Sequence, residues 1–409
     1  MRAPELLAPA GNLEKLKAAI NFGADAVYLG GSKLNLRAFA DNFSNEELAE
    51  GIKYAHERGK KVHVTLNVFP HNDDLDGLED YLTELYELGV DAIIVADPGI
   101  IMTAREVVPN LEIHLSTQAN TVNYKTCEFW HKMGVKRVVL ARELSLEEIS
   151  KVHKKIPETM DMEIFIHGSM CMAYSGRCLL SNYLVGRDAN RGSCAQPCRY
   201  KYSLVEEKRE GEYMPIMEDE HGTYIMNSKD LCMIEHIPEI MQTGAVSFKI
   251  EGRMKSVYYV AATVKAYREA IDAYMASPEN YKFDSRWLEE VSKPSHRQFY
   301  TGFYFDNEEN KQIQSSSSYI RNYDVIGVVK SYDKESGIAT IEHKNKAVEG
   351  DVVEVLRPVG PNATITLNDL HNEKGEKIDS APSSKMIYTA KVEEELEEND
   401  ILIKAKGEN

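Results

Sequence analysis

Long apolar runs are missing from this sequence. No stretch approaches the roughly 18 apolar residues that a membrane-spanning helix needs, and the segment MRAPELLAPAGNLEKL has one arginine and no long apolar core. Such a segment does not match a secretory signal peptide. We therefore expect a cytoplasmic protein without a membrane partner.

A surplus of positive charge is missing as well. The 48 lysines and arginines face 65 aspartates and glutamates, which gives a net charge of −17. Because an acidic chain disfavours non-specific binding to polyanions, any role with nucleic acid must depend on a local basic patch. The 409 residues, 43% of them hydrophobic, have a globular composition and suffice for two or three domains, or for one large barrel with an appendage.

Cysteine is scarce and unevenly placed. Six are present, and four of them, Cys171, Cys178, Cys194 and Cys198, fall in one short segment, while Cys127 and Cys232 stand alone. Thiols stay reduced in the cytoplasm. Clustered thiols in a reducing compartment favour a metal centre over disulfides.

A repeated pattern fills the first two thirds of the chain. A helical stretch is followed by a glycine and a short run of β-branched and apolar residues, as in GADAVYLGG and GVDAIIVADPG. Glycine suits the left-handed position that ends a helix, and the apolar run is typical of a buried parallel strand. Eight strands are predicted, at 5–8, 26–29, 62–67, 92–95, 112–116, 137–140, 163–167 and 246–250. Helix caps between them are predicted at Asn12, Ser44, Asp74 and Ser145.

Eight strands that alternate with helices predict an α/β fold, a (β/α)8 TIM-like barrel. A doubly wound open sheet is the rival, but it usually carries a glycine-rich phosphate turn after the first strand, and LLAPAGN lacks that pattern. We predict a barrel over 1–285 with a cysteine-rich insertion at 168–235, then a connecting segment at 286–322. Short β runs such as GIATIEH and ILIKAKG predict a small C-terminal β-barrel domain at 323–409.

The four clustered cysteines are spaced Cys171-x6-Cys178-x15-Cys194-x3-Cys198. Four thiolates on a loop can bind Zn2+ or an iron–sulfur cluster. Structural zinc sites usually pair cysteines with roughly two to four residues between them, which the first gap does not match. The spacing therefore favours a 4Fe–4S cluster, with zinc and four structural thiols as the alternatives. The insertion follows the seventh strand, at the end of the barrel where active sites lie.

The first part of the same insertion is basic. Residues 168–201 carry five cations against the single acid Asp188, a local net charge of +4; the cations are Arg177, Arg187, Arg191, Arg199 and Lys201. Tyrosines are interspersed with these cations and flank them, at 174, 183, 200 and 202. Cations mixed with aromatic side chains suit single-stranded RNA, whose bases stack on aromatic rings. The alternative is a solvated loop whose tyrosines pack on the cysteine centre.

Two segments around the first cysteines, EIFIHGSMC and GRCLLS, resemble the signature of the collagenase-like peptidase family, class U, number thirty-two. RGSCAQPCRYKY, KIEGRMKSVYYVAATVKAYR and RQFYTGF are also similar to that family, and the tail from 323 onward looks like its C-terminal domain. The resemblance covers essentially the whole chain. It is greatest to the prephenate-dependent tRNA uridine hydroxylases, which make 5-hydroxyuridine at the anticodon wobble position.

This resemblance implies a function, a cofactor and partners. It implies a tRNA-modifying enzyme with a 4Fe–4S cluster whose ligands are Cys171, Cys178, Cys194 and Cys198. The implied partners are the anticodon arm of tRNA, prephenate and a paralogous partner subunit.

Two other functions stay open. The family name implies a peptidase, yet the sequence has no G-x-S-x-G, and His56-Glu57 begins like H-E-x-x-H but meets Lys60 where the second histidine should be. Cys127 and Cys232 are expected in the core rather than as nucleophiles. The other alternative is a non-catalytic iron–sulfur partner subunit for a related chain.

Polar residues at the carboxyl ends of the predicted strands are candidates for a pocket. His167 could move a proton or only form a hydrogen bond near the cluster, and Gln118 could read a uracil edge or only pack at the barrel top. Arg253 and Arg142 could clamp a dicarboxylate such as prephenate, with Glu251 either acting beside them or only neutralising them. We predict His167, Glu251 and Arg253 as catalytic. The predicted substrate-binding residues are Asn67, Gln118, Arg142, Arg177, Arg191 and Lys249.

Overall fold

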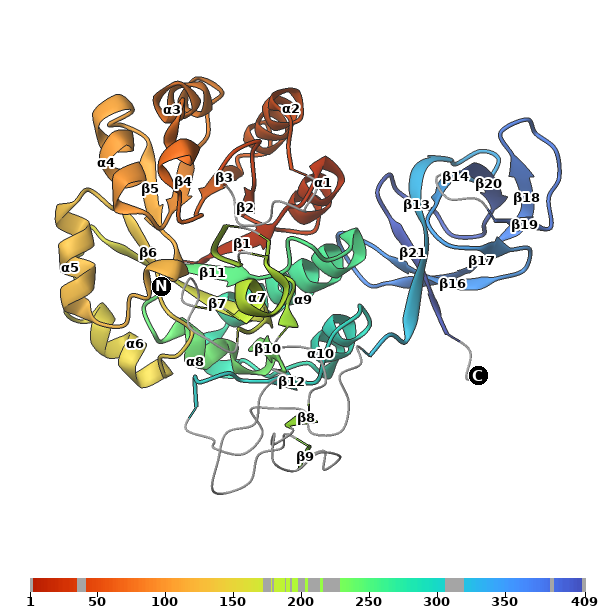
Figure 1. Cartoon of the computed structure of the whole chain (residues 1–409). Helices are drawn as coiled ribbons and strands as arrows, with labels where there is room; N and C mark the ends of the chain where they lie inside the picture. The colour runs from red at the N-terminus through yellow and green to blue at the C-terminus, as the bar shows by residue number, and fades with distance from the viewer. Residues whose placement is uncertain are drawn as a thin grey trace.

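The structure is a computed structural model. It describes residues 3–34, 42–171, 178, 180–187, 189–191, 193–197, 203–204, 214–215, 229–305, 320–382 and 386–406. Figure 1 shows two bodies, a barrel ringed by helices and a smaller all-β unit beside it.

A closed parallel barrel forms the larger body. Its eight strands are β1 (Glu5–Pro9), β2 (Ala26–Leu29), β3 (Lys61–Leu66), β4 (Ala92–Val95), β5 (Glu112–Leu115), β6 (Arg137–Val139), β7 (Asp161–Ser169) and β11 (Ser247–Ile250). They pair in this order, and β11 pairs in parallel with both β7 and β1, which closes the ring. The predicted (β/α)8 fold is confirmed, and an open doubly wound sheet is excluded.

Helices surround the barrel (Figure 1). They are α1 (Leu13–Asn21), α2 (Asn45–His56), α3 (Leu78–Glu87), α4 (Pro98–Val107), α5 (Tyr124–Lys132), α6 (Leu146–His153), α8 (Ile237–Met241), α9 (Val257–Ala276) and α10 (Ser285–Ser292). Side chains of Asn12, Ser44 and Ser145 accept backbone N–H bonds at the starts of α1, α2 and α6, as predicted. The predicted cap at Asp74 is wrong: α3 begins at Leu78 after Gly77, which adopts a left-handed φ of 72°. Asp74 lies in a preceding 3-10 turn, where its carboxylate accepts from the His71 N–H.

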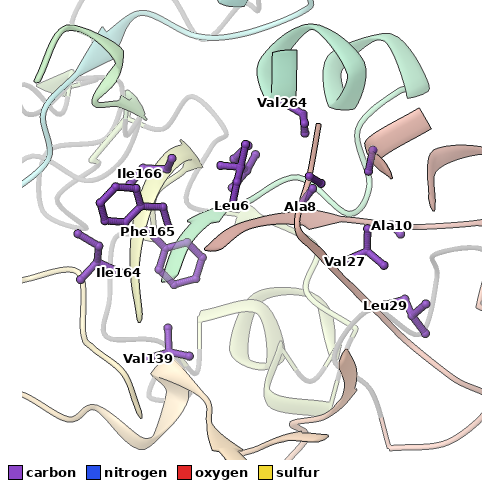
Figure 2. Packing of buried hydrophobic residues seen from close by; sticks show 14 of the residues in the cluster. Leu6, Ala8, Ala10, Val27, Leu29, Val139, Ile164, Phe165, Ile166 and Val264 are labelled. Carbon is purple, nitrogen blue, oxygen red and sulfur yellow. The ribbon is translucent and has the colours of Figure 1, made fainter. Parts of the chain in front are cut away.

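The main hydrophobic core lies between the strands and their helices. Figure 2 shows Leu6, Ile164, Ile166 and Val264 within this layer, and all four are at most 1% exposed. Full burial of such side chains stabilises the fold by about 1.5–3 kcal/mol each. The core therefore holds the strands in a fixed register and fixes the positions of the residues at their ends.

The insertion after β7 returns to the same strand. Within it, the structure places α7 (Leu180–Val185), β8 (Ser203–Leu204), β9 (Met214–Pro215) and β10 (Asp230–Cys232). Strand β10 runs antiparallel to β7 and also pairs with β12 (Phe299–Tyr300), so it extends the sheet past the barrel. Part of the segment that was predicted as a connection, 286–322, thus carries most of α10 and strand β12; residues 306–319 of it lie outside the described part of the chain.

The C-terminal unit is an antiparallel sheet of seven strands in a half-barrel. The strands are β13 (Tyr323–Asp333), β14 (Ile338–His343), β16 (Val352–Leu356), β17 (Ala363–Thr366), β18 (Asn368–Asn372), β20 (Ile387–Lys391) and β21 (Ile401–Ala405), with the short pair β15 (Ala347–Val348) and β19 (Ser380–Ala381) beside them. The sheet order is β17-β16-β21-β13-β14-β20-β18. Its own core surrounds the fully buried ring of Tyr388.

The two bodies share a packed interface. Val328, Leu356 and Ile403 of the C-terminal unit belong to the same hydrophobic cluster as the barrel core. At the edge, Lys265 on α9 donates to the Gly360 carbonyl at 2.9 Å and to Asn362 Oδ1 at 2.8 Å. Apolar and polar contacts together hold the C-terminal unit against α9 and α10.

The helices that the structure describes include none that is both long enough and apolar enough to cross a bilayer.

Candidate functional site

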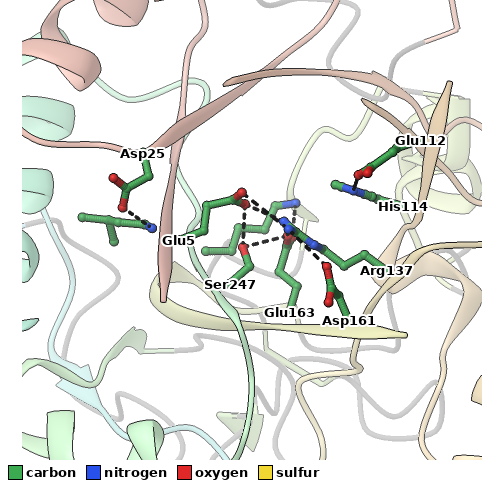
Figure 3. A network of polar contacts seen from close by, with 10 residues as sticks. Glu5, Asp25, Glu112, His114, Arg137, Asp161, Glu163 and Ser247 are labelled. Atoms are coloured by element: carbon green, nitrogen blue, oxygen red, sulfur yellow. Dashed lines mark hydrogen bonds and ion pairs between the residues drawn. The ribbon is translucent and has the colours of Figure 1, made fainter. Parts of the chain in front are cut away.

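A network of charged side chains fills the lower lumen of the barrel. Figure 3 shows Arg137 of β6 reaching Glu5 of β1 and Glu163 of β7, with Ser247 of β11 between the two carboxylates. Strands β6 and β1 are not neighbours, so the Arg137–Glu5 pair crosses the lumen. The Ser247 hydroxyl lies 3.1 Å from both Glu5 Oε1 and Glu163 Oε2. Barrel lumens are usually filled by apolar residues, so this layer is a departure from the common pattern.

Lys249 belongs to this network rather than to the outer rim. Its Nζ lies 2.8 Å from Glu163 Oε1 and 4.4 Å from the centre of the Tyr28 ring, and it is 5% exposed. Burial alone would raise the pKa of Glu163, but the charges of Lys249 and Arg137 reverse this effect and lower it to about 2. Glu163 therefore stays ionised at neutral pH, and its carboxylate holds the Lys249 side chain from below.

Two buried histidines face each other in the same lumen. The rings of His63 on β3 and His114 on β5 meet edge to face with centroids 4.8 Å apart. Burial lowers the pKa of His63 to about 4 and that of His114 well below its usual value, with the Arg137 charge acting in the same direction. Both rings are therefore neutral at physiological pH and add no charge to the layer.

Arg142 links the barrel mouth to the cysteine-bearing segment. It follows β6, is 9% exposed, and donates from Nη1 to the Ser169 carbonyl at 2.8 Å and from Nη2 to Cys171 Sγ at 3.4 Å. Its guanidinium carbon lies 4.7 Å from the centre of the Phe165 ring. Although burial opposes it, the proximity of Cys171, Glu251 and Glu143 raises the pKa of Arg142. These two contacts are made to the cysteine segment rather than to an open pocket.

The structure describes three of the four predicted cluster ligands. Cys171 is exposed, Cys178 and Cys194 are half-buried, and all three are free thiols, whereas Cys198 lies outside the described residues. Cys171 Sγ accepts from Arg142, and Cys194 Sγ accepts from the Gln196 N–H at 3.3 Å. Such N–H donors to sulfur are typical of iron–sulfur ligands, so the donor chemistry fits a cluster. Among the described side chains, however, no three His, Cys, Asp or Glu residues gather closely enough to hold a metal ion. The quartet stays a prediction.

His167 is buried away from the charged lumen. It is 1% exposed, and its ring packs against those of Tyr267, Phe299 and Tyr259, with centroid distances of 5.5, 5.3 and 5.9 Å. Burial lowers its pKa to about 3, helped by the charges of Lys255 and His296. A neutral imidazole packed among aromatic rings can stabilise the rim of the barrel. The predicted catalytic role of His167 stays a prediction.

The other two predicted catalytic residues lie after β11. The Glu251 carbonyl accepts from the Tyr259 hydroxyl at 2.7 Å, and the Glu251 N–H donates to His167 O at 2.8 Å. Gly168 has a φ of 111°, and a Cβ there would meet Glu251 O at 2.4 Å, so only glycine allows the two rim segments to approach this closely. Arg253 is 4% exposed and donates from Nη1 to Thr65 Oγ1 on β3 at 2.7 Å.

Two amides at the barrel mouth have polar atoms without a partner in the described part of the structure. These atoms are Asn67 Oδ1, after β3, and Gln118 Nε2, after β5; Gln118 is 3% exposed. Unpaired buried polar groups are costly and tend to occur at functional sites. The predicted roles of the two amides in binding substrate stay predictions.

The basic insertion presents an exposed apolar turn. On α7, Tyr183 is 87% exposed, and Leu184 and Val185 are 45% and 47% exposed. The turn is anchored by Ser181, which is fully buried and whose Oγ accepts from the Ala195 N–H at 3.0 Å, next to Cys194. Exposed Arg187 follows it. Arg177 and the side chain of Arg191 lie outside the described residues, so their predicted roles are not tested.

The polar layer of the lumen was not foreseen from the sequence. Its signal was present: polar residues recur at every second position in strands that are otherwise apolar, as in KVHVTL, EIHL and SFKI. In a strand, residues two apart share a face. Polar residues at every second position of a parallel strand therefore predict side chains that face the lumen.

Comparison with known proteins places both bodies in one family. Residues 11–314 match the model described as peptidase family U32, and residues 321–402 match the peptidase family U32 C-terminal domain. A Bacillus subtilis (strain 168) protein named tRNA hydroxylation protein P1 is 44% identical over 407 residues, which cover 99% of this chain and 96% of that protein.

Two relatives from Escherichia coli (strain K12) extend the comparison. One, named tRNA hydroxylation protein P, is 40% identical over 446 aligned positions, which cover 98% of this chain and 97% of that protein. The other, named a 23S rRNA 5-hydroxycytidine synthase, is 39% identical over 269 residues, which cover 66% of this chain and 39% of that protein. Family models that cover the barrel and the C-terminal unit, with relatives that align over nearly the full length, show that the chain belongs to peptidase family U32.

Proposed function

We propose that this chain is an enzyme that hydroxylates tRNA, and that it converts the wobble uridine of the anticodon to 5-hydroxyuridine in a prephenate-dependent reaction. The observation that carries the proposal is the 44% identity, over 99% of this chain and 96% of the relative, to a protein named for tRNA hydroxylation. Wobble uridine and prephenate are the finer parts of the proposal, and they follow from the family resemblance of the cysteine signature.

The cofactor in this proposal is a 4Fe–4S cluster. Cys171, Cys178, Cys194 and Cys198 would hold it, and when bound it would supply one-electron redox chemistry at the barrel mouth. Free thiols, the Arg142 donor to Cys171 and the backbone donor to Cys194 support this choice. Zinc is the lesser alternative for the same four sulfurs.

The cysteine-bearing insertion suits an RNA substrate. Its first part, residues 168–201, carries a net charge of +4 in a chain of −17, so the field of that part attracts the phosphate backbone. Exposed Tyr183 offers a face on which an unpaired base can stack. An anticodon loop supplies both unpaired bases and closely spaced phosphates.

Other residues of the chain would bind the small substrate, close the lumen and support the cysteine segment. Arg253 at the mouth can orient a dicarboxylate such as prephenate, because guanidinium groups bind carboxylates, whereas both Nη atoms of Arg142 donate to the cysteine segment. Below them, the Lys249–Glu163–Arg137–Glu5 network closes the lumen and keeps its charges paired. Neutral His167 supports the start of the cysteine segment without adding charge.

The test combines metal analysis with tRNA nucleoside profiling. The chain purified without oxygen should contain about four irons and an equal amount of acid-labile sulfide. It should restore 5-hydroxyuridine in tRNA of a strain that lacks its own hydroxylases, and Cys194→Ala should abolish this.

Other outcomes point to the alternatives. A colourless, zinc-loaded chain that cleaves gelatin would establish a peptidase. A cluster-loaded chain that binds tRNA but supports modification only with a second family member would establish a partner subunit.

A further inference from the structure

Gln118 lies in a turn that is fixed to the Arg142 side of the barrel mouth. It belongs to the 3-10 turn Thr117–Ala119 that follows β5. Thr117 Oγ1 donates to Leu140 O at 3.3 Å, and the Ala141 N–H donates to Thr121 O at 3.1 Å. The segment of Leu140 and Ala141 leads directly into Arg142, which contacts Cys171. These hydrogen bonds therefore join the Gln118 turn to the loop whose Arg142 contacts the cysteine segment.

The side-chain amide of Gln118 has a defined orientation. Ser116 Oγ accepts from the Gln118 N–H at 3.5 Å and donates to Gln118 Oε1 at 3.1 Å. Because the hydroxyl proton needs an acceptor, the amide presents its oxygen to Ser116 and its Nε2 donors elsewhere. Gln118 is 3% exposed, and its Nε2 has no hydrogen-bond partner among the residues that the structure describes. The donor is thus held in place, desolvated and unsatisfied.

We propose that Gln118 Nε2 selects the pyrimidine, by donating a hydrogen bond to the O4 carbonyl oxygen of uracil. This proposal rests on the proposed function and deepens it, because it assigns the base preference to one residue. At the position of O4, cytosine carries an amino group, which is a donor. Two donors would then face each other in a buried site, and a site built around one hydrogen bond rejects the analogue that leaves it unpaired.

The O4 oxygen lies close to the carbon atom that reacts. It is bonded to C4, the ring carbon next to C5, so a contact to O4 also positions the carbon that becomes hydroxylated. One of the relatives is named for 5-hydroxycytidine and others for tRNA hydroxylation. Under the proposed function the same ring position is modified on uridine here and on cytidine by that relative, and a single donor or acceptor can set the choice.

The experiment compares the affinities of the full-length, cluster-loaded chain for two RNAs. These are anticodon stem-loops that differ only by uridine or cytidine at the wobble position, and binding is measured by fluorescence anisotropy without prephenate, so that no turnover occurs. The wild-type chain should prefer the uridine stem-loop on the order of 10-fold. Gln118→Glu, which places an acceptor at the same point, should reverse the preference, because carboxylates accept from the cytosine amino group.

Two further variants make the result decisive. Gln118→Met keeps the length of the side chain without a donor, and it should bind both RNAs with equal affinity. Asn123→Asp makes the same amide-to-acid change five residues away, where the side chain caps α5 by accepting from the Thr126 N–H. An aspartate caps equally well, so this control should keep the wild-type preference.

The outcomes separate this proposal from the proposed function. If Gln118→Glu and Gln118→Met both keep the wild-type ratio of affinities, or if the wild-type chain has no preference, the assignment is wrong, whether or not the chain hydroxylates tRNA. If Gln118→Glu does not fold, Gln118→Met decides alone. A chain that prefers uridine through Gln118 but never forms 5-hydroxyuridine would overturn the proposed function and leave this assignment standing.

Discussion

The Arg142 guanidinium lies 3.4 Å from Cys171 Sγ and 2.8 Å from the Ser169 carbonyl, so one side chain bridges the loop after β6 and the start of the cysteine segment. This contact joins the rigid barrel to the segment that carries the predicted cluster ligands. Because Arg142 is also packed over the Phe165 ring, its position is set by the barrel rather than by the loop.

Loss of Arg142 should weaken the cluster. We expect Arg142→Ala to lower the affinity for iron by about 10- to 100-fold, as is typical when a hydrogen-bond partner of a metal ligand is removed. Iron and sulfide per chain, measured after dialysis against a chelator, report this loss. Arg142→Lys should retain part of the iron because it keeps the charge.

Arg286→Ala is the matched control for that experiment. Arg286 is exposed and forms an ion pair with Asp284, two residues before it, so its loss should leave the iron content unchanged. Equal iron retention by Arg142→Ala and the wild-type chain would contradict a role of Arg142 in holding the cluster.

The Lys249–Glu163 pair should be critical for stability. Lys249→Met leaves the Glu163 carboxylate buried with fewer cationic partners, and breaking a buried pair in this way costs about 3–5 kcal/mol. Urea unfolding of the purified variants measures this cost. Lys151→Ala removes an exposed pair with Glu147, and it should leave the free energy of unfolding nearly unchanged.

A double variant tests whether the cost comes from the uncompensated charge. Lys249→Met with Glu163→Leu should be more stable than Lys249→Met alone, because no buried carboxylate remains without its ammonium. If the double variant is less stable than the single one, the loss reflects packing in the lumen instead.

His167 should make stability depend on pH. Its pKa is about 3 in the folded chain and about 6.5 when unfolded. Below pH 6.5 the unfolded chain binds a proton that the folded chain does not, so the free energy of unfolding falls as the pH decreases. By pH 5 the loss due to His167 should reach about 2 kcal/mol, and above pH 6.5 its contribution is complete.

Two measurements check this pH dependence. Urea unfolding between pH 7 and pH 5 should show a smaller loss for His167→Gln, which cannot titrate, than for the wild-type chain. NMR of the histidine rings should show His167 still neutral at pH 5. A titration midpoint near 6.5 for this ring would rule out the buried, neutral state.

Tyr183 should contribute to RNA affinity through stacking. Tyr183→Ala should weaken binding of an anticodon stem-loop by about 1–3 kcal/mol, the contribution of one base–aromatic stack, while Tyr183→Phe should bind like the wild-type chain. The slope of affinity against salt should not change, because no phosphate contact is lost.

Tyr86→Ala provides the comparison for Tyr183. Tyr86 is 44% exposed on α3, outside the basic insertion, and its loss should leave RNA binding unchanged. If Tyr183→Ala binds RNA as tightly as Tyr86→Ala, the exposed turn of α7 has another purpose.

The strands of both bodies were largely predictable, and the reason is local. Runs such as AVYL and AIIV are apolar throughout because a parallel strand is buried on both faces, and the predicted bounds 26–29 and 92–95 agree with β2 and β4. The start of α3 was not predictable, because Asp74 is a good cap in isolation but closes a separate turn on His71. In the C-terminal unit, the sequences of β17 and β18, ATIT and NDLHN, lack the apolar run that marked their neighbours.

The sequence by itself determined the barrel, its cysteine-rich insertion and the family, because these depend on periodicity, spacing and motifs that lie close together along the chain. Only the tertiary structure decided what the polar residues do. Glu5 meets Ser247 and Arg137 only because the sheet closes, and the same closure brings the Arg142 loop to Cys171. The pairing of each charge, the neutral state of each buried imidazole and the lack of a partner for the Gln118 donor all depend on neighbouring side chains. These neighbours are far away in the sequence, and only folding brings them close.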